Sequence, residues 1–206
     1  ESGTVYSLDE IEAIGKVARD NGLPLHMDGA RFANALVALD ASPADMTWKR
    51  GVDILSFGAT KNGCWCAEAI IFLKPELATE MPFIRKRSAQ LFSKTRFISA
   101  QFEAYLEGGL WLDLARNANA MADRLRAGID AASKSRLAWR TTTNEVFAVL
   151  PKEAAARAEA QGAKFYDWPV PAETPDLLQT DEMLIRLVTS FATTADDVDR
   201  FLAMLA

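Results

Sequence analysis

The feature that most constrains the fold is the stretch between residues 23 and 63. Two short apolar runs, at 23–27 and 52–57, bracket a segment in which Phe32, Leu36 and Leu39 recur with helical spacing. This order predicts a strand, a helix and a second strand, about the size of one βαβ unit. Each predicted strand ends in a turn that contains glycine. In an open α/β sheet such strand ends meet at the ligand crevice, so the stretch predicts an α/β fold with its binding site there.

The two turns carry the side chains with the most specific chemistry, Asp28 after the first run and Lys61 after the second. A carboxylate beside a pyridine nitrogen favours the protonated ring, because opposite charges stabilise each other. A lysine that is partly desolvated can lose its proton and attack an aldehyde. Alone, Asp28 is better explained as a helix cap, and Lys61 as a surface lysine. Together they favour pyridoxal 5′-phosphate (PLP) held by Lys61 as a Schiff base.

Three further residues are candidates for the same site. Arg31 lies three residues after Asp28, in the first turn of the predicted helix, where it would reach the cofactor ring or a substrate carboxylate; the alternative is a plain surface arginine. His26 shares a strand face with Asp28 if the period is two, and we expect it to support the site by a hydrogen bond. Arg186 interrupts an apolar strand at 184–189, which is costly unless it pairs with a carboxylate or faces a polar cleft. The alternative for Arg186 is a strand with one solvated face.

Composition excludes several functional classes. The net charge of −5 over 206 residues disfavours a partner that is nucleic acid or a membrane surface. Cys64 and Cys66 are too few for a disulfide framework or a zinc site, and a single histidine leaves a metal site short of ligands, so we expect no metal. No run reaches transmembrane length and no signal peptide precedes Glu1, so we expect a cytoplasmic protein.

The first half of the chain continues this α/β pattern. A helix is predicted from Ser7 or Asp9 to about Asn21, and a loop at 40–45. After Asn62-Gly63, the run 67–73 predicts a strand that returns antiparallel after a two-residue turn. A short helix at 75–81 and a basic stretch at 84–97 follow, and then a long helical region that Gly108-Gly109 interrupts.

The second half has short strands and helices. The helix at 110–133 leads into a new domain, so the predicted domains are 1–108 and 109–206. Strands are predicted at 146–150, 164–168 and 183–189, and helices at 152–161 and at 195–206, the latter capped by Thr193 or Thr194.

The beginning of the chain predicts that residues are missing upstream. There is no initiator methionine, and the first ten residues resemble a loop that enters a helix. A sheet without its early strands would expose an unpaired edge and an apolar face. We therefore expect a homo-oligomer, a dimer or a tetramer.

Four motifs, in this order, resemble those of low-specificity L-threonine aldolases. They are His-Met-Asp-Gly-Ala-Arg at 26–31, Phe-Gly-Ala-Thr-Lys-Asn-Gly at 57–63, Ala-Glu-Ala-Ile-Ile-Phe at 67–72 and Ile-Arg-Leu-Val-Thr-Ser at 185–190. That family belongs to the β-eliminating lyase and threonine aldolase group of aspartate-aminotransferase-like PLP enzymes. The resemblance implies the later half of a fold type I large domain, residues 1–108, and a small α/β C-terminal domain, residues 109–206.

The resemblance also implies residue roles. Lys61 would be the Schiff-base lysine, Asp28 would pair with the pyridine nitrogen, Arg31 would lie near ring and substrate, and Arg186 would bind the substrate carboxylate. A cation in the stretch 85–96 would reach the PLP phosphate, in a neighbouring subunit; Lys94 and Arg96 are the candidates.

The implied reaction cleaves L-threonine or L-allo-threonine to glycine and acetaldehyde, with a small amino acid as substrate. Family members carry an additional amino-terminal part with a phosphate-binding loop and a histidine stacked on the cofactor, so the activity is expected of the full-length parent. The alternatives are another PLP-dependent β-eliminating lyase or aminotransferase, or an inactive truncated homologue that only assembles with partners. A dinucleotide fold is set aside because no Gly-x-Gly-x-x-Gly follows a strand.

Overall fold

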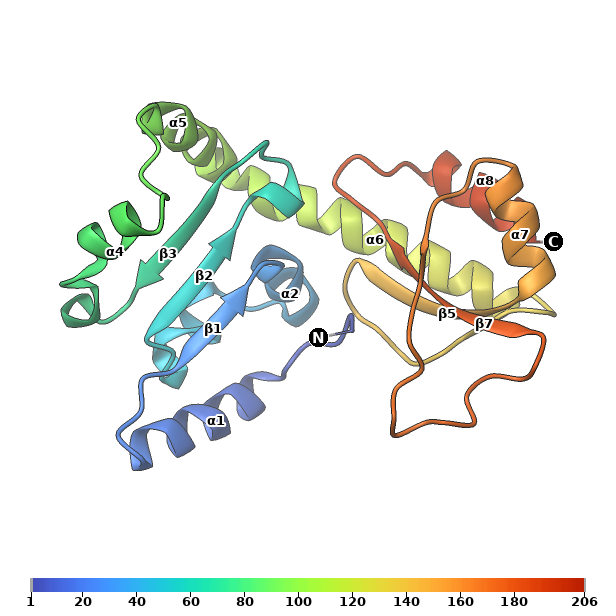
Figure 1. Cartoon of the computed structure of the whole chain (residues 1–206), viewed down its shortest axis with the longest axis horizontal. Helices are drawn as coiled ribbons and strands as arrows, with labels where there is room; N and C mark the ends of the chain where they lie inside the picture. Colours follow the sequence, from blue (N-terminus) through green and yellow to red (C-terminus); the bar gives the residue numbers. More distant parts are fainter. Residues whose placement is uncertain (1, 206) are drawn as a thin grey trace. The chain divides into compact units, whose positions relative to one another are not determined.

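The computed structural model describes residues 2–205, and the chain divides into two compact units (Figure 1). One unit is Tyr6–Leu114, and the other combines residues 2–5 with residues 115–205. The predicted boundary after residue 108 lies just before helix α6 (Leu110–Ala131), whereas the units separate inside that helix.

The first unit contains a three-stranded sheet in the order β1 (His26–Gly29), β2 (Ile54–Gly58), β3 (Glu68–Phe72). β1 and β2 are parallel and α2 (Phe32–Leu39) connects them, which confirms the predicted strand–helix–strand unit (Figure 1). β1 begins at His26, later than predicted. Pro24 has no N–H to donate, and the Leu25 N–H donates to the Asp53 carboxylate (2.9 Å).

β3 pairs antiparallel with β2, as predicted, but the predicted two-residue turn is wrong. Residues 59–67, here named the Lys61 turn, connect the strands and include the 3₁₀ helix η2 (Thr60–Asn62). The Ala59 N–H donates to the Ala67 carbonyl (3.0 Å), which closes the base of this turn. The residues between Ala59 and Ala67 therefore form a loop that contains η2 rather than a tight hairpin turn.

Helix α1 (Leu8–Asp20) begins at the predicted cap, Ser7. The Glu10 N–H donates to Ser7 Oγ (3.2 Å) and the Ser7 N–H donates to Glu10 Oε2 (2.7 Å), a reciprocal capping box. The Ser7 N–H and the Ser7 hydroxyl both donate to the Glu10 carboxylate, and these two bonds lower the pKa of Glu10. Part of the predicted loop at 40–45 is wrong, because Ser42 caps a short helix, α3 (Pro43–Met46).

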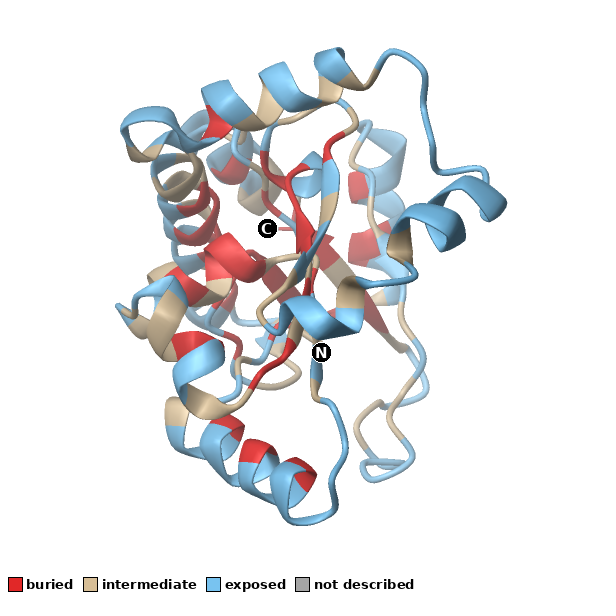
Figure 2. Cartoon of the chain, turned by 90° about the vertical axis from the view of Figure 1, so that its left-hand side faces the viewer, coloured by how far each residue is buried: buried red, intermediate tan, exposed pale blue. Residues whose placement is uncertain are grey.

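The remaining elements of the first unit are three 3₁₀ helices and two α-helices. The predicted helix at 75–81 is a 3₁₀ helix followed by a separate α-helix, and Gly108 and Gly109, both with positive φ, produce the predicted break. The elements are η1 (Trp48–Arg50), η3 (Pro75–Ala78), α4 (Met81–Arg87), α5 (Thr95–Leu106) and η4 (Glu107–Gly109). Residues 82–94 are all exposed (Figure 2).

The core of the first unit lies on one face of its sheet, around Phe57 of β2. The Phe57 ring contacts four other aromatic rings, with centroid distances from 5.7 to 6.2 Å. These rings belong to Phe32, Phe102, Tyr105 and Trp111. This packing fixes the strand that leads into the Lys61 turn.

The second unit contains a four-stranded sheet in the order β4 (Arg136–Leu137), β5 (Glu145–Pro151), β7 (Glu182–Val188), β6 (Tyr166–Asp167), with every neighbouring pair antiparallel. The predicted strand at 164–168 is shortened to β6, and β4 was not predicted. The helices are the later part of α6, α7 (Lys152–Ala160) and α8 (Ala195–Leu205). Thr194 caps α8, because its Oγ1 accepts the Asp197 N–H (3.2 Å) and its N–H donates to Asp197 Oδ2 (2.9 Å).

Both faces of this second sheet are covered. Val146, Ala148 and Leu150 of β5 belong to the core cluster that includes residues of all three helices. Phe147 and Val149, on the opposite face, pack with Leu184 and with two tryptophans. Residues 145–150 are consequently all buried.

Candidate active site

Asp28 and Lys61 lie at the same edge of the first sheet. In the parallel register of β1 and β2, Asp28 is opposite Ser56, and Lys61 follows the end of β2 by three residues. The two strand ends approach closely, because a Cβ added to Gly58 would lie 3.1 Å from Ala30 Cα. The sheet therefore brings the acid and the lysine to the carboxyl ends of adjacent parallel strands, where ligands of α/β sheets bind.

The side chain of Lys61 is exposed, and among residues 2–205 its amine has no hydrogen bond or ion pair. The backbone around it is well fixed. The Ala59 carbonyl accepts the N–H groups of Asn62 (3.0 Å) and Cys64 (3.1 Å). Gly63 has a φ of +118°, which glycine adopts without strain. The turn thus presents an unpaired amine from a defined backbone.

Two side chains that the sequence interpretation missed hold the Lys61 turn. Buried Asn62 donates both amide hydrogens, to Tyr105 Oη (2.7 Å) and to the Trp111 carbonyl (2.8 Å). Gln101 Oε1 accepts the N–H groups of Trp65 (2.9 Å) and Cys66 (3.1 Å). The signal for Asn62 was its place beside the lysine, but Asn-Gly was interpreted only as a turn; nothing local marks Gln101.

His26 and Asp28 both lie exposed on β1, and Met27 between them is more buried, as expected for period two. Asp28 Oδ1 accepts the Ala30 N–H (2.9 Å), which leaves its other oxygen available to a ligand. His26 Nε2 lies 2.8 Å from Ser56 Oγ. Ser56 was also missed, although period two along β2 indicates that it lies on the same face as the residue opposite it, Asp28.

Arg31 is half-buried at the N-cap of α2, one residue before the predicted first turn. It therefore stays close in sequence and in space to the end of β1. Lys94 and Arg96 lie at the start of α5, and the Arg96 guanidinium lies over the Phe97 ring (4.8 Å). Within residues 2–205, neither Lys94 nor Arg96 has a hydrogen bond or ion pair with Lys61 or Asp28. The assignment of Lys94 and Arg96 to the PLP phosphate therefore stays a prediction.

Arg186 lies in β7 of the second unit, opposite Phe147 in the register. Its guanidinium lies over the rings of Trp168 (4.9 Å) and Tyr166 (5.5 Å), and its Nε is 3.8 Å from Glu145 Oε1. Nε is buried and has no hydrogen-bond partner in the described chain. Arg186 thus lies against aromatic rings with hydrogen-bonding capacity remaining for an anionic group.

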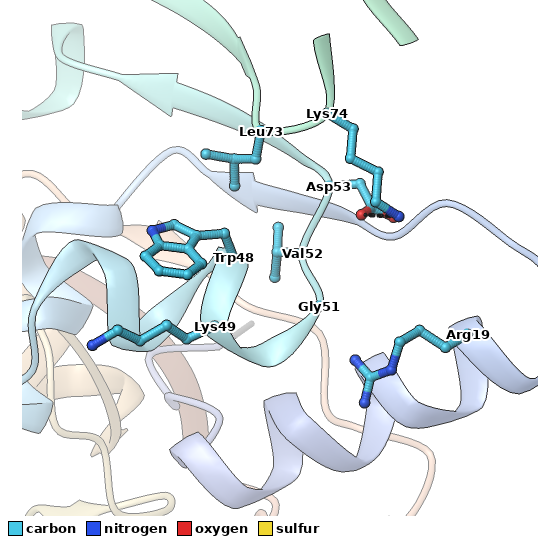
Figure 3. A pocket seen from close by; sticks show the side chains of 8 residues that line it. All are labelled: Arg19, Trp48, Lys49, Gly51, Val52, Asp53, Leu73 and Lys74. Carbon is cyan, nitrogen blue, oxygen red and sulfur yellow. Dashed lines mark ion pairs between the residues drawn. The ribbon is translucent and has the colours of Figure 1, made fainter. Parts of the chain in front are cut away.

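A surface hollow lies at the opposite end of the first sheet, where β2 begins and β3 ends (Figure 3). In it Lys74 Nζ pairs with Asp53 Oδ1 (2.7 Å). Burial raises the pKa of Asp53, but the bonds from Lys74 and from the Leu25 N–H outweigh burial and leave that pKa below its ordinary value. This hollow contains neither Lys61 nor Asp28 and is separate from the site.

The residues present fit the ring of PLP at two points. An unpaired lysine amine suits the aldehyde carbon, and a carboxylate with a free oxygen suits a protonated pyridine nitrogen.

In the described part of the chain, no group of three or more histidine, cysteine, aspartate or glutamate side chains is placed to hold a metal ion. No helix within residues 2–205 is long and apolar enough to cross a membrane.

Comparisons with known proteins agree with this arrangement. Residues 1–153 match the β-eliminating lyase family. The chain is 41% identical over 166 residues to a low-specificity L-threonine aldolase of Pseudomonas sp., and 42% identical over 166 residues to one of Pseudomonas aeruginosa. In each case the match covers 81% of this chain and 48% of the relative, so the chain spans about half the length of the curated relatives it matches.

Solved structures give the same result. The structure of Leishmania major threonine aldolase matches all of this chain and 57% of its own, with a TM-score of 0.88 and 31% identity. Mouse CSAD matches 99% of this chain and 50% of its own, with a TM-score of 0.66 and 15% identity, a likeness of fold alone. The mixed α/β fold therefore corresponds to about half of a fold type I PLP enzyme, as predicted. The chain belongs to the β-eliminating lyase family and is a homologue of the low-specificity L-threonine aldolases.

Proposed function

We propose that this chain carries the lysine-bearing part of a PLP site that cleaves L-threonine or L-allo-threonine to glycine and acetaldehyde in the complete protein. The observation that carries the proposal is the placement of Lys61, on a fixed turn, at the same sheet edge as Asp28. The names and identities of the Pseudomonas relatives support the choice of substrate.

Each residue has a role in this proposal. Lys61 binds the aldehyde carbon of PLP, and Asp28 holds the proton on the pyridine nitrogen, while His26 and Ser56 support the same face. When bound, PLP supplies a ring that accepts the electron pair released at the substrate α-carbon. Arg31 is the remaining residue assigned to the ring, and it also binds the substrate.

Arg186 binds the substrate carboxylate in this proposal, through a guanidinium that its aromatic neighbours hold in place. Fixing the carboxylate restricts rotation of the substrate, and orientation of this kind can supply several kcal/mol of a barrier, on the order of 7–11 in favourable cases. Lys94 and Arg96 are proposed for the PLP phosphate.

We also propose a homo-oligomer located in the cytoplasm. Large apolar side chains of the first unit support an oligomer, since they are exposed along the sheet and the basic stretch, as at Ile70 (55%) and Phe83 (69%). In addition, β1 and β3 each pair on one side only within the described chain.

The test adds PLP to the protein and then L-threonine. We expect an absorbance band near about 420 nm, typical of lysine-bound PLP, and release of acetaldehyde and glycine, both lost in Lys61→Ala. A keto acid in place of acetaldehyde would indicate β-elimination or transamination. A folded protein without the band would contradict PLP binding by this chain.

A further inference from the structure

We propose that Asn62 is a positioning residue for Lys61. The side-chain amide of Asn62, bonded to Tyr105 and Trp111, fixes the backbone from which the Lys61 amine would reach the aldehyde of PLP. We name these three residues the Asn62 clamp. The proposal rests on the role of Lys61 in the proposed function, and it assigns a task to a residue that does not touch the substrate.

Burial differs sharply between neighbouring residues of the Lys61 turn. Asn62 is 4% exposed, whereas its neighbours Lys61 and Gly63 are exposed. A polar side chain is buried at little cost only when its hydrogen bonds are satisfied. Both amide hydrogens of Asn62 are used, at 2.7 and 2.8 Å. The buried amide therefore fixes the residue next to the lysine at two points.

The partners of Asn62 are themselves fixed. Tyr105, on α5, is 3% exposed, and Trp111 lies in the first turn of α6. Both rings contact Phe57, at 6.2 and 5.7 Å. Phe57 belongs to β2, the strand that leads directly into the Lys61 turn. The Asn62 clamp thus connects the Lys61 turn to α5 and α6, and both helices contact β2 through Phe57.

The Trp111 carbonyl can only accept a hydrogen bond, so its partner in the turn must be a donor. Burial raises the pKa of Tyr105, so its hydroxyl stays protonated, and the hydroxyl oxygen accepts the second amide hydrogen. Aspartate has the shape of asparagine but, when ionised, no donor. Asn62→Asp therefore removes the bond to the Trp111 carbonyl without a large change of volume, although the Tyr105 hydroxyl can donate to the new carboxylate. Asn62→Ala removes both bonds without adding charge.

A lysine side chain has four rotatable bonds, so a reaction at its amine depends on where its Cα is held. Bonds from the two sides of the turn share this task. Asn62 fixes the side next to the lysine, and Gln101 fixes the side that returns to β3. Loss of the Asn62 bonds should affect Lys61 more than loss of the Gln101 bonds, because Asn62 is adjacent.

The experiment compares wild type, Asn62→Asp, Asn62→Ala and the control Leu36→Ala. Leu36 is 2% exposed in the same core cluster and does not bond to the turn. Amide hydrogen exchange of residues 59–64 reports the order of the turn, and the rate at which PLP forms a Lys61 adduct, trapped with borohydride and mapped by mass spectrometry, reports positioning.

We expect the turn amides of both Asn62 variants to exchange faster than those of wild type. The rate at which PLP forms the Lys61 adduct should fall by about tenfold, the factor of one hydrogen bond. Leu36→Ala should keep the exchange of the turn amides and the adduct rate at wild-type values. Each protein is measured equally far below its own unfolding midpoint. Wild-type exchange and adduct rate in the Asn62 variants, or an equal loss of adduct rate in Leu36→Ala, would overturn the proposal. If wild type formed no adduct at Lys61, the proposed function would be contradicted, and the exchange of the turn amides would still decide whether Asn62 fixes the turn.

Discussion

The two sheets differ in how many of their faces are covered. In the second unit, β5 is buried at every residue from 145 to 150, because helices cover one face and aromatic side chains the other. In the first unit, the core covers one face, while the other exposes His26 and Asp28 on β1. Both faces of the second sheet are packed, and Arg186 lies against aromatic rings there, whereas the first sheet leaves one face to polar side chains that can meet a ligand. Substitutions should therefore separate stability from binding.

The largest expected effect is loss of stability in Phe147→Ala. Phe147 is 1% exposed and its ring contacts Trp139 (4.6 Å) and Trp168 (5.3 Å). Removing a buried phenylalanine ring costs about 3–5 kcal/mol. The measurement is denaturant unfolding followed by tryptophan fluorescence, which these two tryptophans make sensitive to the second unit.

Phe83→Ala is the matched control, because Phe83 is 69% exposed on α4. Its free energy of unfolding should stay within about 0.5 kcal/mol of wild type. Similar losses of unfolding free energy in the two phenylalanine variants would contradict the claim that the second sheet is packed more completely than the exposed surface of the first unit.

The next effect is on PLP binding, in Asp28→Asn. Asparagine keeps an oxygen for the Ala30 N–H, so stability should change little. It cannot balance a protonated pyridine nitrogen, and loss of such a charged hydrogen bond costs about 1.5–3 kcal/mol. We expect the dissociation constant, from absorbance titration, to rise about 10- to 100-fold. An unchanged constant would place the pyridine nitrogen elsewhere.

A smaller effect concerns pH and the second unit. Hydrogen bonding to Arg136 and to the Gln179 N–H lowers the pKa of Glu182 from 4.5 to about 2. This carboxylate therefore stabilises the fold above its ordinary pKa, and the contribution is lost as the pH falls from about 4.5 towards about 2. Arg136 is 44% exposed, so we expect only about 1 kcal/mol.

Glu182→Gln tests this by its free energy of unfolding at about pH 6 and about pH 3. The variant should be less stable than wild type at the higher pH, and the difference should shrink at the lower. A difference that does not depend on pH would rule out the ion pair as its cause.

The smallest effect is expected on the open face of the first sheet. Ile70 of β3 is 55% exposed, so Ile70→Thr keeps a β-branched residue and loses little burial. The free energy of unfolding should change by less than about 0.5 kcal/mol, while self-association, measured by light scattering, should weaken. A large loss of stability would show that this face is packed.

The sequence was informative where the signal is local. Asp28 and Lys61 each follow an apolar run, so both strand ends could be predicted without knowing any contact. The Ser7–Glu10 capping box and the break at Gly108 are equally local, since each depends on residues within one turn. These features follow from the residue types alone.

The missed features depend on contacts between distant residues. The partners of Asn62 lie 43 and 49 positions away, and those of Gln101 lie 36 and 35 positions away. These bonds hold the Lys61 turn, and since their partners are distant in sequence, the local pattern predicted a two-residue turn instead. β4, which pairs with β5, has only two residues, and two residues are too few for a periodic pattern.

The most direct test of the central claim is to locate the PLP-reactive lysine. The protein is incubated with PLP, reduced with borohydride and mapped by peptide mass spectrometry. We predict a label on Lys61 well above that on Lys49 and Lys74, which pair with Asp45 and Asp53. Labels spread over the exposed lysines, or an unlabelled Lys61, would contradict the assignment of Lys61 as the cofactor lysine.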